Sequence, residues 1–215
     1  MCGRYTIFTE DEIVEIRAII QEMSRIFGDG GVNTGEIFPT NVAPILTLSK
    51  NRLAPSPASW GFPRWEGKGV IINARCETAL EKPTFSRPLL SRRCVIPSTG
   101  FYEWAYESIL TPQLSFFPGE NTHSAKEPKV KLHFRRPGEP MLYMAGMVST
   151  FTDNMGNTKD AFTILTTAAN ESMASFHDRM PVILAASECE EWISSEGFMR
   201  EVLRRKGPEL EWRAA

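Results

Sequence analysis

Apolar residues recur at helical spacing near the start of the chain. These positions are Ile13, Ile16, Ile20, Met23 and Phe27. A spacing of three to four residues is typical of an amphipathic helix with one buried face. Thr9 and Glu12 have the spacing of a capping box, and the glycines that follow position 27 provide a stop. The pattern therefore predicts a first helix over residues 10–27.

Beyond this helix, short β-branched or aromatic runs alternate with turns rich in Gly and Pro. The runs predict strands at residues 45–48, 70–74, 93–97, 130–134, 141–148, 162–167 and 181–184. Many strands with few helices indicate an α+β fold. We expect a single domain over residues 1–215, with a curved, barrel-like and mostly antiparallel β core flanked by a few helices.

Three further segments complete the expected organisation. Asn170 can cap a short helical turn that runs through Phe176, and Ser187 with Glu190 forms a second capping box before a C-terminal helix. Residues 106–129 are rich in Pro, Gly, Asn, Ser and Lys and lack periodicity, which predicts a surface loop inserted between two strands.

Composition mainly excludes functions. The 215 residues are 42% hydrophobic and 23% charged, as in a globular protein, and no apolar run reaches the length of a membrane span. The net charge of −2 gives no global attraction to nucleic acid, so any contact with DNA requires a local patch. Four cysteines without CxxC spacing favour a reducing compartment, and we expect a cytoplasmic monomer without metal or cofactor.

Cys2 is the first residue with distinctive chemistry. Removal of Met1, which a small second residue normally allows, leaves a thiol beside a free α-amine. Ordinary pKa values of about 7.7–8.0 for an α-amine and about 8.5 for a thiol leave both groups partly deprotonated near neutral pH. The amine can then act as base for thiol attack on an amide, or both groups can add to one aldehyde and close a thiazolidine ring. A cysteine without function is the alternative.

The segment NARCET follows the apolar run at 70–72. Alternation along a strand places the side chains of Asn73 and Arg75 on one face, where an amide and a guanidinium project together. A guanidinium suits a phosphate or a carboxylate. The alternative is a polar strand end that faces water.

The segment GFYEW, residues 100–104, surrounds a carboxylate with aromatic residues. We expect Glu103 to lie among Phe101, Tyr102 and Trp104. Burial among rings favours the protonated form of a carboxyl group and suits it to shuttle a proton. The alternative is an outward glutamate on an edge strand.

The segment HDRMP begins where the turn after Asn170 ends. Among the three histidines only His177 adjoins an acid and an arginine, Asp178 and Arg179, which makes it the candidate for an acid–base role. The alternative is a structural, hydrogen-bonded histidine. Thiol, amide, carboxylate and imidazole are the parts of a catalytic site. Their separation in sequence means that only the fold can assemble them.

Seven segments in this order resemble the SOS response-associated peptidase (SRAP) family. They are CGRY at 2–5, NVAP at 41–44, WGF at 60–62, NARCET at 73–78, GFYEW at 100–104, LTTAAN at 165–170 and HDRMP at 177–181. The resemblance covers residue 2 to about residue 193. It implies an α+β domain with a groove for single-stranded DNA, recognition of abasic sites, and a thiazolidine DNA–protein crosslink that shields the lesion.

The resemblance also implies roles for residues of these motifs. Cys2 would be the nucleophile, Asn73 would position its amine, and Glu103 and His177 would exchange protons during ring formation and reversal. The implied DNA-binding residues are Arg4, Asn41, Pro44, Trp65, Arg75, Thr166 and Arg179. Among these, the arginines would contact phosphates, and the proline and tryptophan would wedge against or stack on bases.

Other functions fit parts of the same pattern. An imine at the abasic sugar acidifies its C2′ protons, which adds strand cleavage by β-elimination as a side activity. The family name points to a cysteine peptidase or self-processing enzyme. An N-terminal-cysteine amidotransferase also begins Met-Cys-Gly, but the later motifs do not fit it. A non-covalent single-stranded nucleic-acid binder is the alternative outside catalysis.

Overall fold

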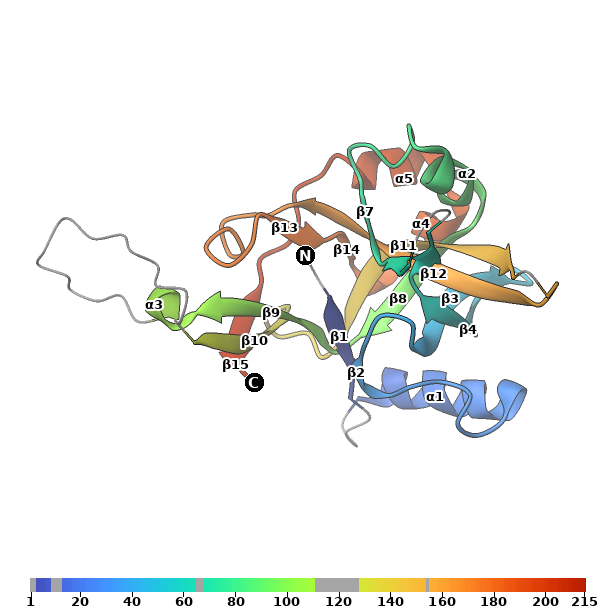
Figure 1. The fold of residues 1–215 in the computed structure, drawn as a ribbon, viewed down its shortest axis with the longest axis horizontal. Helices are drawn as coiled ribbons and strands as arrows, with labels where there is room; N and C mark the ends of the chain where they lie inside the picture. The colour runs from blue at the N-terminus through green and yellow to red at the C-terminus, as the bar shows by residue number, and fades with distance from the viewer. Residues whose placement is uncertain (1–2, 9–12, 65–67, 111–127, 154) are drawn as a thin grey trace, which may run out of the picture.

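The computed structural model describes residues 3–8, 13–64, 68–110, 128–153 and 155–215. Two sheets and a small hairpin make up its β structure (Figure 1). The elements are β1 (Arg4–Ile7), α1 (Val14–Phe27), β2 (Gly35–Ile37), β3 (Val42–Ser49), β4 (Arg52–Trp60), β5 (Phe62–Pro63), β6 (Val70–Ile71), β7 (Asn73–Arg75), α2 (Pro83–Ser91), β8 (Arg93–Ser98), β9 (Gly100–Tyr106), α3 (Glu107–Leu110), β10 (Lys129–Arg135), β11 (Leu142–Thr152), β12 (Thr158–Ala168), β13 (Arg179–Pro181), β14 (Ile183–Leu184), the 3-10 turn η1 (Ala186–Glu188), α4 (Cys189–Ser194), α5 (Glu196–Val202) and β15 (Glu211–Ala214).

Five strands close into a barrel. They pair in the order β12–β4–β3–β8–β11, and β11 returns to β12. All pairings in this ring are antiparallel except that of β12 with β4. The short strands β7 and β13 extend β12, and β14 extends β11. The expected barrel-like, mostly antiparallel core is confirmed.

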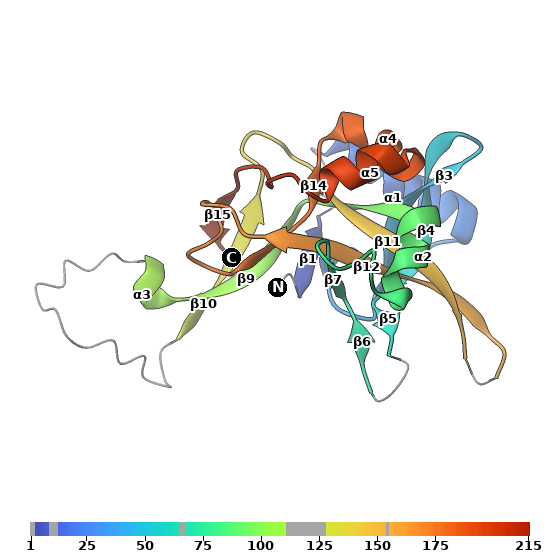
Figure 2. The same ribbon diagram turned by 90° about the horizontal axis from the view of Figure 1, so that it is seen from above.

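A second sheet of five strands extends from one side of the barrel, in the order β15–β10–β9–β1–β2 (Figures 1 and 2). Apolar residues from this sheet, the barrel and α1 form one continuous core cluster. The edge-on contact of Tyr5 with Trp60, ring centroids 5.1 Å apart, joins β1 to β4 within it. In Figure 1, α1 lies below the barrel and α2, α4 and α5 lie above it. None of the described helices is long and apolar enough to cross a membrane.

The helix boundaries differ from two of the capping predictions. Helix α1 ends at Phe27 as expected but begins at Val14 rather than residue 10, and the predicted capping box lies outside the described residues. In the C-terminal region the carboxylate of Glu188, not Glu190, accepts from the N–H of Ala185. Helical turns therefore begin at Ala186, one residue before the predicted cap at Ser187, because Glu188 accepts the backbone N–H of Ala185 that the helix itself leaves unbonded.

Most strand predictions hold for the apolar runs, and they fail where the sequence lacks such runs. The predicted strand 181–184 is divided at Val182 between β13, which pairs with β12, and β14, which pairs with β11. The run 70–74 forms two strands separated at Ile72, whose carbonyl oxygen accepts from Trp60 Nε1 and from the N–H of Ile164. Strand β4 was not predicted because prolines interrupt it. The loop prediction for 106–129 needs adjustment at its ends, since Tyr106 closes β9, residues 107–110 form α3 and Lys129 opens β10; residues 111–127 lie outside the described part.

Candidate functional site

The motif GFYEW forms β9, and the pleat of that strand divides its side chains between two faces. Paired residues of neighbouring antiparallel strands share a face. The inner face, toward the barrel, carries Tyr5, Phe101, Glu103, Leu132 and Phe134. The outer face carries Arg4, Tyr102, Trp104, Lys131 and His133. The expectation that Glu103 lies among all three aromatic residues is therefore wrong, because only Phe101 is on its face.

Glu103 is nonetheless buried, with only 7% of its surface exposed. It pairs in register with Leu132 of β10, whose side chain is fully buried. On its other side, β1 pairs with β9 through Arg4–Tyr102 and Tyr5–Phe101. Continuing this register by one residue puts Gly3 opposite Glu103. The start of the first strand therefore runs beside this carboxylate; Cys2 itself lies outside the described residues.

Asn73 opens β7, which lies parallel to β12 through the pairs Asn73–Ile164 and Arg75–Thr166. The burial pattern of β7 has a buried Ala74 between its two polar neighbours, as alternation predicts. Trp60 connects this strand to β1, because its ring contacts Tyr5 and its Nε1 donates to the carbonyl oxygen of Ile72 at 3.1 Å. Asn73 is thus held next to the core that carries the N-terminal strand.

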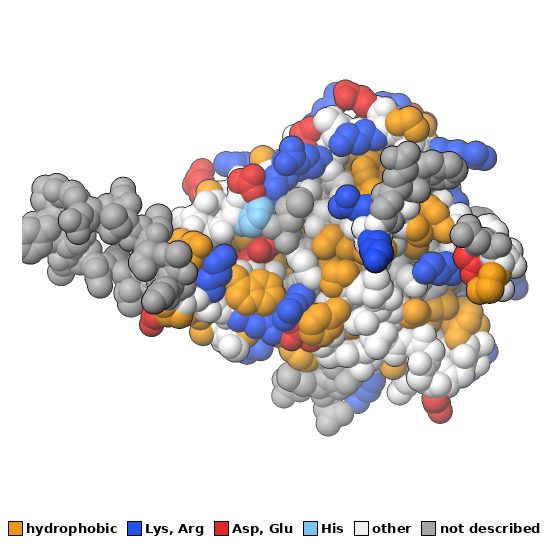
Figure 3. Space-filling view, viewed as in Figure 1, with side chains coloured by type: hydrophobic (Ala, Val, Ile, Leu, Met, Phe, Trp, Pro, Cys, Tyr) orange, Lys and Arg blue, Asp and Glu red, His pale blue; other side chains and the backbone are white. Residues whose placement is uncertain are grey.

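His177 closes the turn that Asn170 begins. This turn forms as predicted, with the side chain of Asn170 accepting from the N–H of Ser172 at 3.1 Å. Phe176 packs edge-on against Phe134 with ring centroids 5.3 Å apart, which seats the turn on the inner face with Glu103. A histidine side chain is visible in Figure 3, and of the two described histidines only His177 is open to solvent, since His133 is 3% exposed.

The three candidate arginines have different surroundings. Arg75 is exposed, and within the described part of the chain it has no ion pair. The guanidinium of Arg4 lies between the rings of Phe38 and Trp104, 4.6 and 4.9 Å from their centroids, and pairs with Glu36 at 3.0 Å. Because Arg4 lies on the outer face of the sheet and Glu103 on the inner face, the sheet separates the two side chains.

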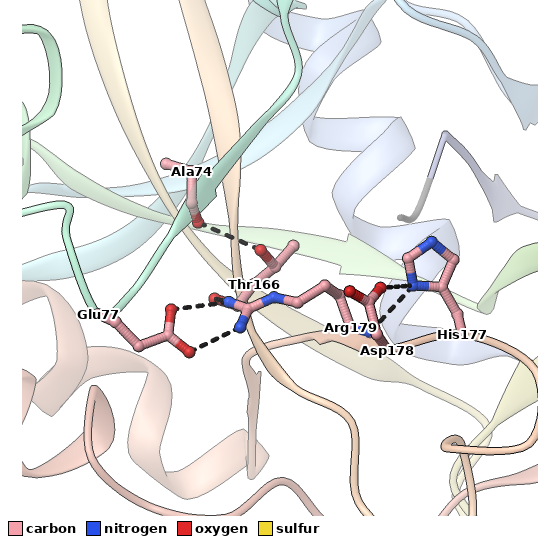
Figure 4. Close-up of polar contacts among 6 residues, drawn as sticks. All are labelled: Ala74, Glu77, Thr166, His177, Asp178 and Arg179. Carbon is pink, nitrogen blue, oxygen red and sulfur yellow. Dashed lines mark hydrogen bonds and ion pairs between the residues drawn. The ribbon is translucent and has the colours of Figure 1, made fainter.

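The guanidinium of Arg179 is turned toward protein groups. It pairs with both oxygens of Glu77 and donates to the backbone carbonyl of Thr166, and its side chain is only 11% exposed (Figure 4). The side chain of Thr166 is itself fully buried, and its hydroxyl lies 3.5 Å from the carbonyl oxygen of Ala74.

The remaining sequence candidates are Asn41, Pro44 and Trp65. Asn41 closes a turn, its Oδ1 accepting from the N–H of Phe38 at 2.9 Å. Pro44 is buried in β3 opposite Pro57, a placement that does not favour a wedge between bases, since a wedge needs an accessible ring. Trp65 lies outside the described residues.

Two acidic residues at the candidate site were not identified from sequence. Glu36 bridges Arg4 and Lys131, with a contact of 2.6 Å to the lysine, and Lys131 lies over the ring of Tyr102 at 3.8 Å. Glu77 binds Arg179. Glu77 belongs to the NARCET segment, which was a usable signal, whereas Glu36 stands in a three-residue strand without a motif.

The other cysteines are buried free thiols, as expected. Burial raises the pKa of the Cys76 thiol and raises that of Cys189 to about 12. Among the residues with described positions, no group of three His, Cys, Asp or Glu side chains is arranged to hold a metal ion. Because Cys76, Cys94 and Cys189 are buried, and burial disfavours the thiolate, we do not assign reactive thiol chemistry to them.

Known proteins with similar sequences share most of this chain. The Bacillus subtilis protein named abasic site processing protein YoqW is 36% identical over 208 residues, which are 90% of this chain and 80% of that protein. The Escherichia coli abasic site processing protein YedK is 26% identical over 198 residues, 91% of this chain and 81% of YedK.

Solved structures show the same fold. A Bordetella bronchiseptica protein superposes with a TM-score of 0.73 at 20% identity, covering 100% of this chain and 99% of that one. A Bacteroides thetaiotaomicron protein gives 0.70 at 22% identity, covering 99% and 91%. The family model described as SOS response associated peptidase (SRAP) matches residues 1–214. This chain therefore belongs to the SOS response associated peptidase family.

Proposed function

We propose that this protein recognises abasic sites in single-stranded DNA and joins them covalently through Cys2. Relatives named as abasic site processing proteins support the substrate. The observation that carries the proposal is the buried carboxylate of Glu103 beside the first strand, on the face against which the His177 turn packs. An acid–base pair next to the N-terminal strand is what aldehyde capture by an N-terminal cysteine requires.

The chemistry balances without a cofactor. After removal of Met1, the α-amine of Cys2 adds to the C1′ aldehyde of the ring-opened abasic sugar, and loss of one water gives an imine. The thiol then adds to the imine carbon, and its proton passes to the nitrogen as the thiazolidine ring closes. The sum is one aminothiol and one aldehyde converted to one ring and one water. The missing base also removes the cost of flipping a nucleotide out of a stack.

Each candidate side chain has a task in this sequence. Asn73 orients the amine, and Glu103 and His177 deliver and remove the protons of dehydration, ring closure and reversal. From the imine, removal of a C2′ proton by Glu103 or His177 leads instead to β-elimination, so a slow strand-cleaving activity accompanies crosslinking.

Contacts with the DNA strand come from a local patch on a chain of net charge −2. Figure 3 shows Lys and Arg side chains around exposed hydrophobic groups on the face of the molecule drawn there. Arg75 is exposed and free of ion pairs to described residues, so it is best placed to bind a phosphate, with Arg4 as a second cation. Asn41 and Trp65 complete the proposed contacts, whereas the buried Thr166 supports β7 from within. Few neutralised phosphates imply a shallow dependence of affinity on salt.

The decisive experiment incubates the protein with a single-stranded oligonucleotide that holds one abasic site. We expect a heat-stable crosslink that Cys2→Ala abolishes and Cys189→Ala retains, because the latter thiol is buried and its pKa is raised. Intact mass of the free protein establishes whether Met1 has been removed. Mass of the adduct should equal protein plus DNA minus one water.

Other outcomes identify the alternatives. A shifted band without covalent product indicates a non-covalent binder. Cleavage of peptides that depends on Cys2, with no product on abasic DNA, indicates a cysteine peptidase. Either result would overturn the proposed crosslinking activity.

We further infer that the protein acts as a cytoplasmic monomer. The free thiols at Cys76, Cys94 and Cys189 agree with a reducing compartment. Light scattering of the purified protein tests the monomer, for which we expect the 24.2 kDa mass of one chain.

A further inference from the structure

The ion pair of Glu77 with Arg179 joins two segments that carry candidate catalytic residues. Glu77 follows β7, which begins with Asn73, and Arg179 opens β13, two residues after His177. The contact is bidentate, with 2.7 Å from Nη1 to Oε1 and 2.8 Å from Nη2 to Oε2 (Figure 4). A paired fork of this kind fixes the direction of both groups as well as their distance.

The carbonyl oxygen of Thr166 adds a third anchor from the strand between them. It accepts from Arg179 Nη2 at 2.6 Å and from the N–H of Cys76 at 2.9 Å. Strand β12 pairs with β7 on one side and β13 on the other, so this oxygen contacts both neighbours. The guanidinium of Arg179 thus ties β7, β12 and β13 together.

Arg179 in turn determines what surrounds the imidazole of His177. Its backbone N–H donates to His177 Nδ1 at 2.9 Å, and the carboxylate of Asp178 lies 2.7 Å from the same nitrogen. A single ring nitrogen cannot accept from one group and donate to the other at once. Nδ1 accepting from Arg179 puts the proton of neutral imidazole on Nε2, whereas Nδ1–H donating to Asp178 leaves Nε2 as a base. The position of the Arg179 backbone therefore affects which form of His177 is present.

The Glu77 carboxylate is held as an anion against Arg179. Hydrogen bonding to Arg179 lowers the pKa of Glu77 to about 2, so this carboxylate is ionised at all physiological pH values. A phosphate gripped by the same two nitrogens would have to displace it. In this structure the fork is occupied by Glu77 and by the carbonyl oxygen of Thr166.

We propose that Glu77 is a positioning residue that, through Arg179, fixes the imidazole of His177. Its effect on DNA chemistry rests on the proposed crosslinking function. Its effect on the imidazole is independent of crosslinking, so an experiment can contradict the positioning role without contradicting the proposed function.

The first experiment uses the free protein and measures the imidazole itself. Nitrogen-15 NMR at constant pH reports the proton distribution between Nδ1 and Nε2 of His177, assigned by comparison with His177→Gln. Glu77→Gln keeps the size of the side chain and removes its charge, and we expect it to change both nitrogen shifts. Glu77→Asp should restore them in part. Unchanged shifts in Glu77→Gln would overturn the proposal, whether or not the protein crosslinks DNA.

A matched control comes from a second arginine fork. Arg205 binds both oxygens of Glu188 at 2.6 and 2.7 Å and also donates to a backbone carbonyl, that of Ile183. This pair lies near the C-terminal helices, so Glu188→Gln removes an equivalent contact elsewhere. We expect Glu188→Gln to leave the His177 shifts unchanged, and equal changes in both variants would also overturn the proposal.

The second experiment separates positioning from DNA binding. The rate of crosslinking at saturating DNA should fall about 10-fold or more in Glu77→Gln, since small misplacement of a reacting group is costly. Affinity for single-stranded DNA with a tetrahydrofuran abasic analogue, which has no aldehyde, should stay within about twofold. Tighter binding with an unchanged rate would show that Glu77 only masks a phosphate site, and the positioning role would be wrong.

Discussion

The two faces of the five-stranded sheet receive neighbouring residues of one motif and use them differently. On the inner face, Glu103 is buried and pairs in register with the fully buried Leu132. On the outer face, Trp104 lies against Arg4, and Lys131 lies over Tyr102. In the proposed function, the inner face supplies the carboxylate for proton transfer and the outer face supplies cations for the DNA strand. A motif read as one unit in sequence is two sites in space because a strand alternates its side chains.

The largest expected difference between the faces is in stability. Phe134 on the inner face is fully buried, stacks on Phe101 with ring centroids 5.4 Å apart and meets Phe176 edge-on at 5.3 Å. Phe134→Ala should lower the free energy of unfolding by about 3–5 kcal/mol, because it leaves a cavity. The partly exposed Trp104, changed to Ala, should cost less than about 2 kcal/mol. Urea denaturation followed by fluorescence or circular dichroism measures both, and equal losses would remove the distinction.

The next difference is in chemistry. Glu103→Gln should slow crosslinking about 100-fold at saturating DNA, since general acid–base groups contribute rates of this order. Lys131→Gln, on the outer face, should leave the rate constant unchanged. Single-turnover crosslinking on denaturing gels gives both values. A wild-type rate in Glu103→Gln would exclude its role in proton transfer.

A related test is the pH dependence of stability. Burial, together with the charges of Arg213, Arg135 and Lys131, lowers the pKa of His133 to about 4. A histidine in the unfolded chain has a pKa of about 6.5. Between about pH 4 and about pH 6.5 the unfolded chain therefore binds more protons than the folded protein, so unfolding becomes easier as pH falls. The protein should lose about 2–3 kcal/mol of stability from about pH 6.5 to about pH 4.

Urea titrations across this range measure that loss. His133→Gln should flatten the profile, because it removes the group whose pKa is lowered by burial. A profile that is equally steep without His133 would assign the dependence to other groups.

The smallest expected effect is on DNA affinity. Arg4→Gln or Lys131→Gln should weaken binding of single-stranded DNA about 3- to 10-fold and reduce the slope of log affinity against log salt by about 0.7 per cation. The crosslinking rate at saturation should not change. Fluorescence anisotropy at several salt concentrations measures the slope, with Lys50→Gln in the β3–β4 turn as control. Equal losses for Lys50 would show only a general charge effect.

Much of the fold could be predicted from sequence because local patterns determine it. The periodic run to Phe27 gave the helix end, the apolar runs gave most barrel strands, and Asn170 gave its turn. Strand β4 was missed since prolines at 55 and 57 suggest loop, yet its neighbours β3 and β12 supply enough pairing. Strand β15 was missed because four residues carry no clear pattern, and β10 recruits them.

By itself the sequence determined which chemical groups are present: the thiol of Cys2, the amide of Asn73, the carboxylate of Glu103 and the imidazole of His177. Only the tertiary structure decided their neighbours. It put Glu103 on the face away from Tyr102 and Trp104, and it turned Arg179 from an open cation into a partner of Glu77. The reason is that composition and spacing fix what a segment can do, whereas burial and charge pairing arise between segments that are distant along the chain.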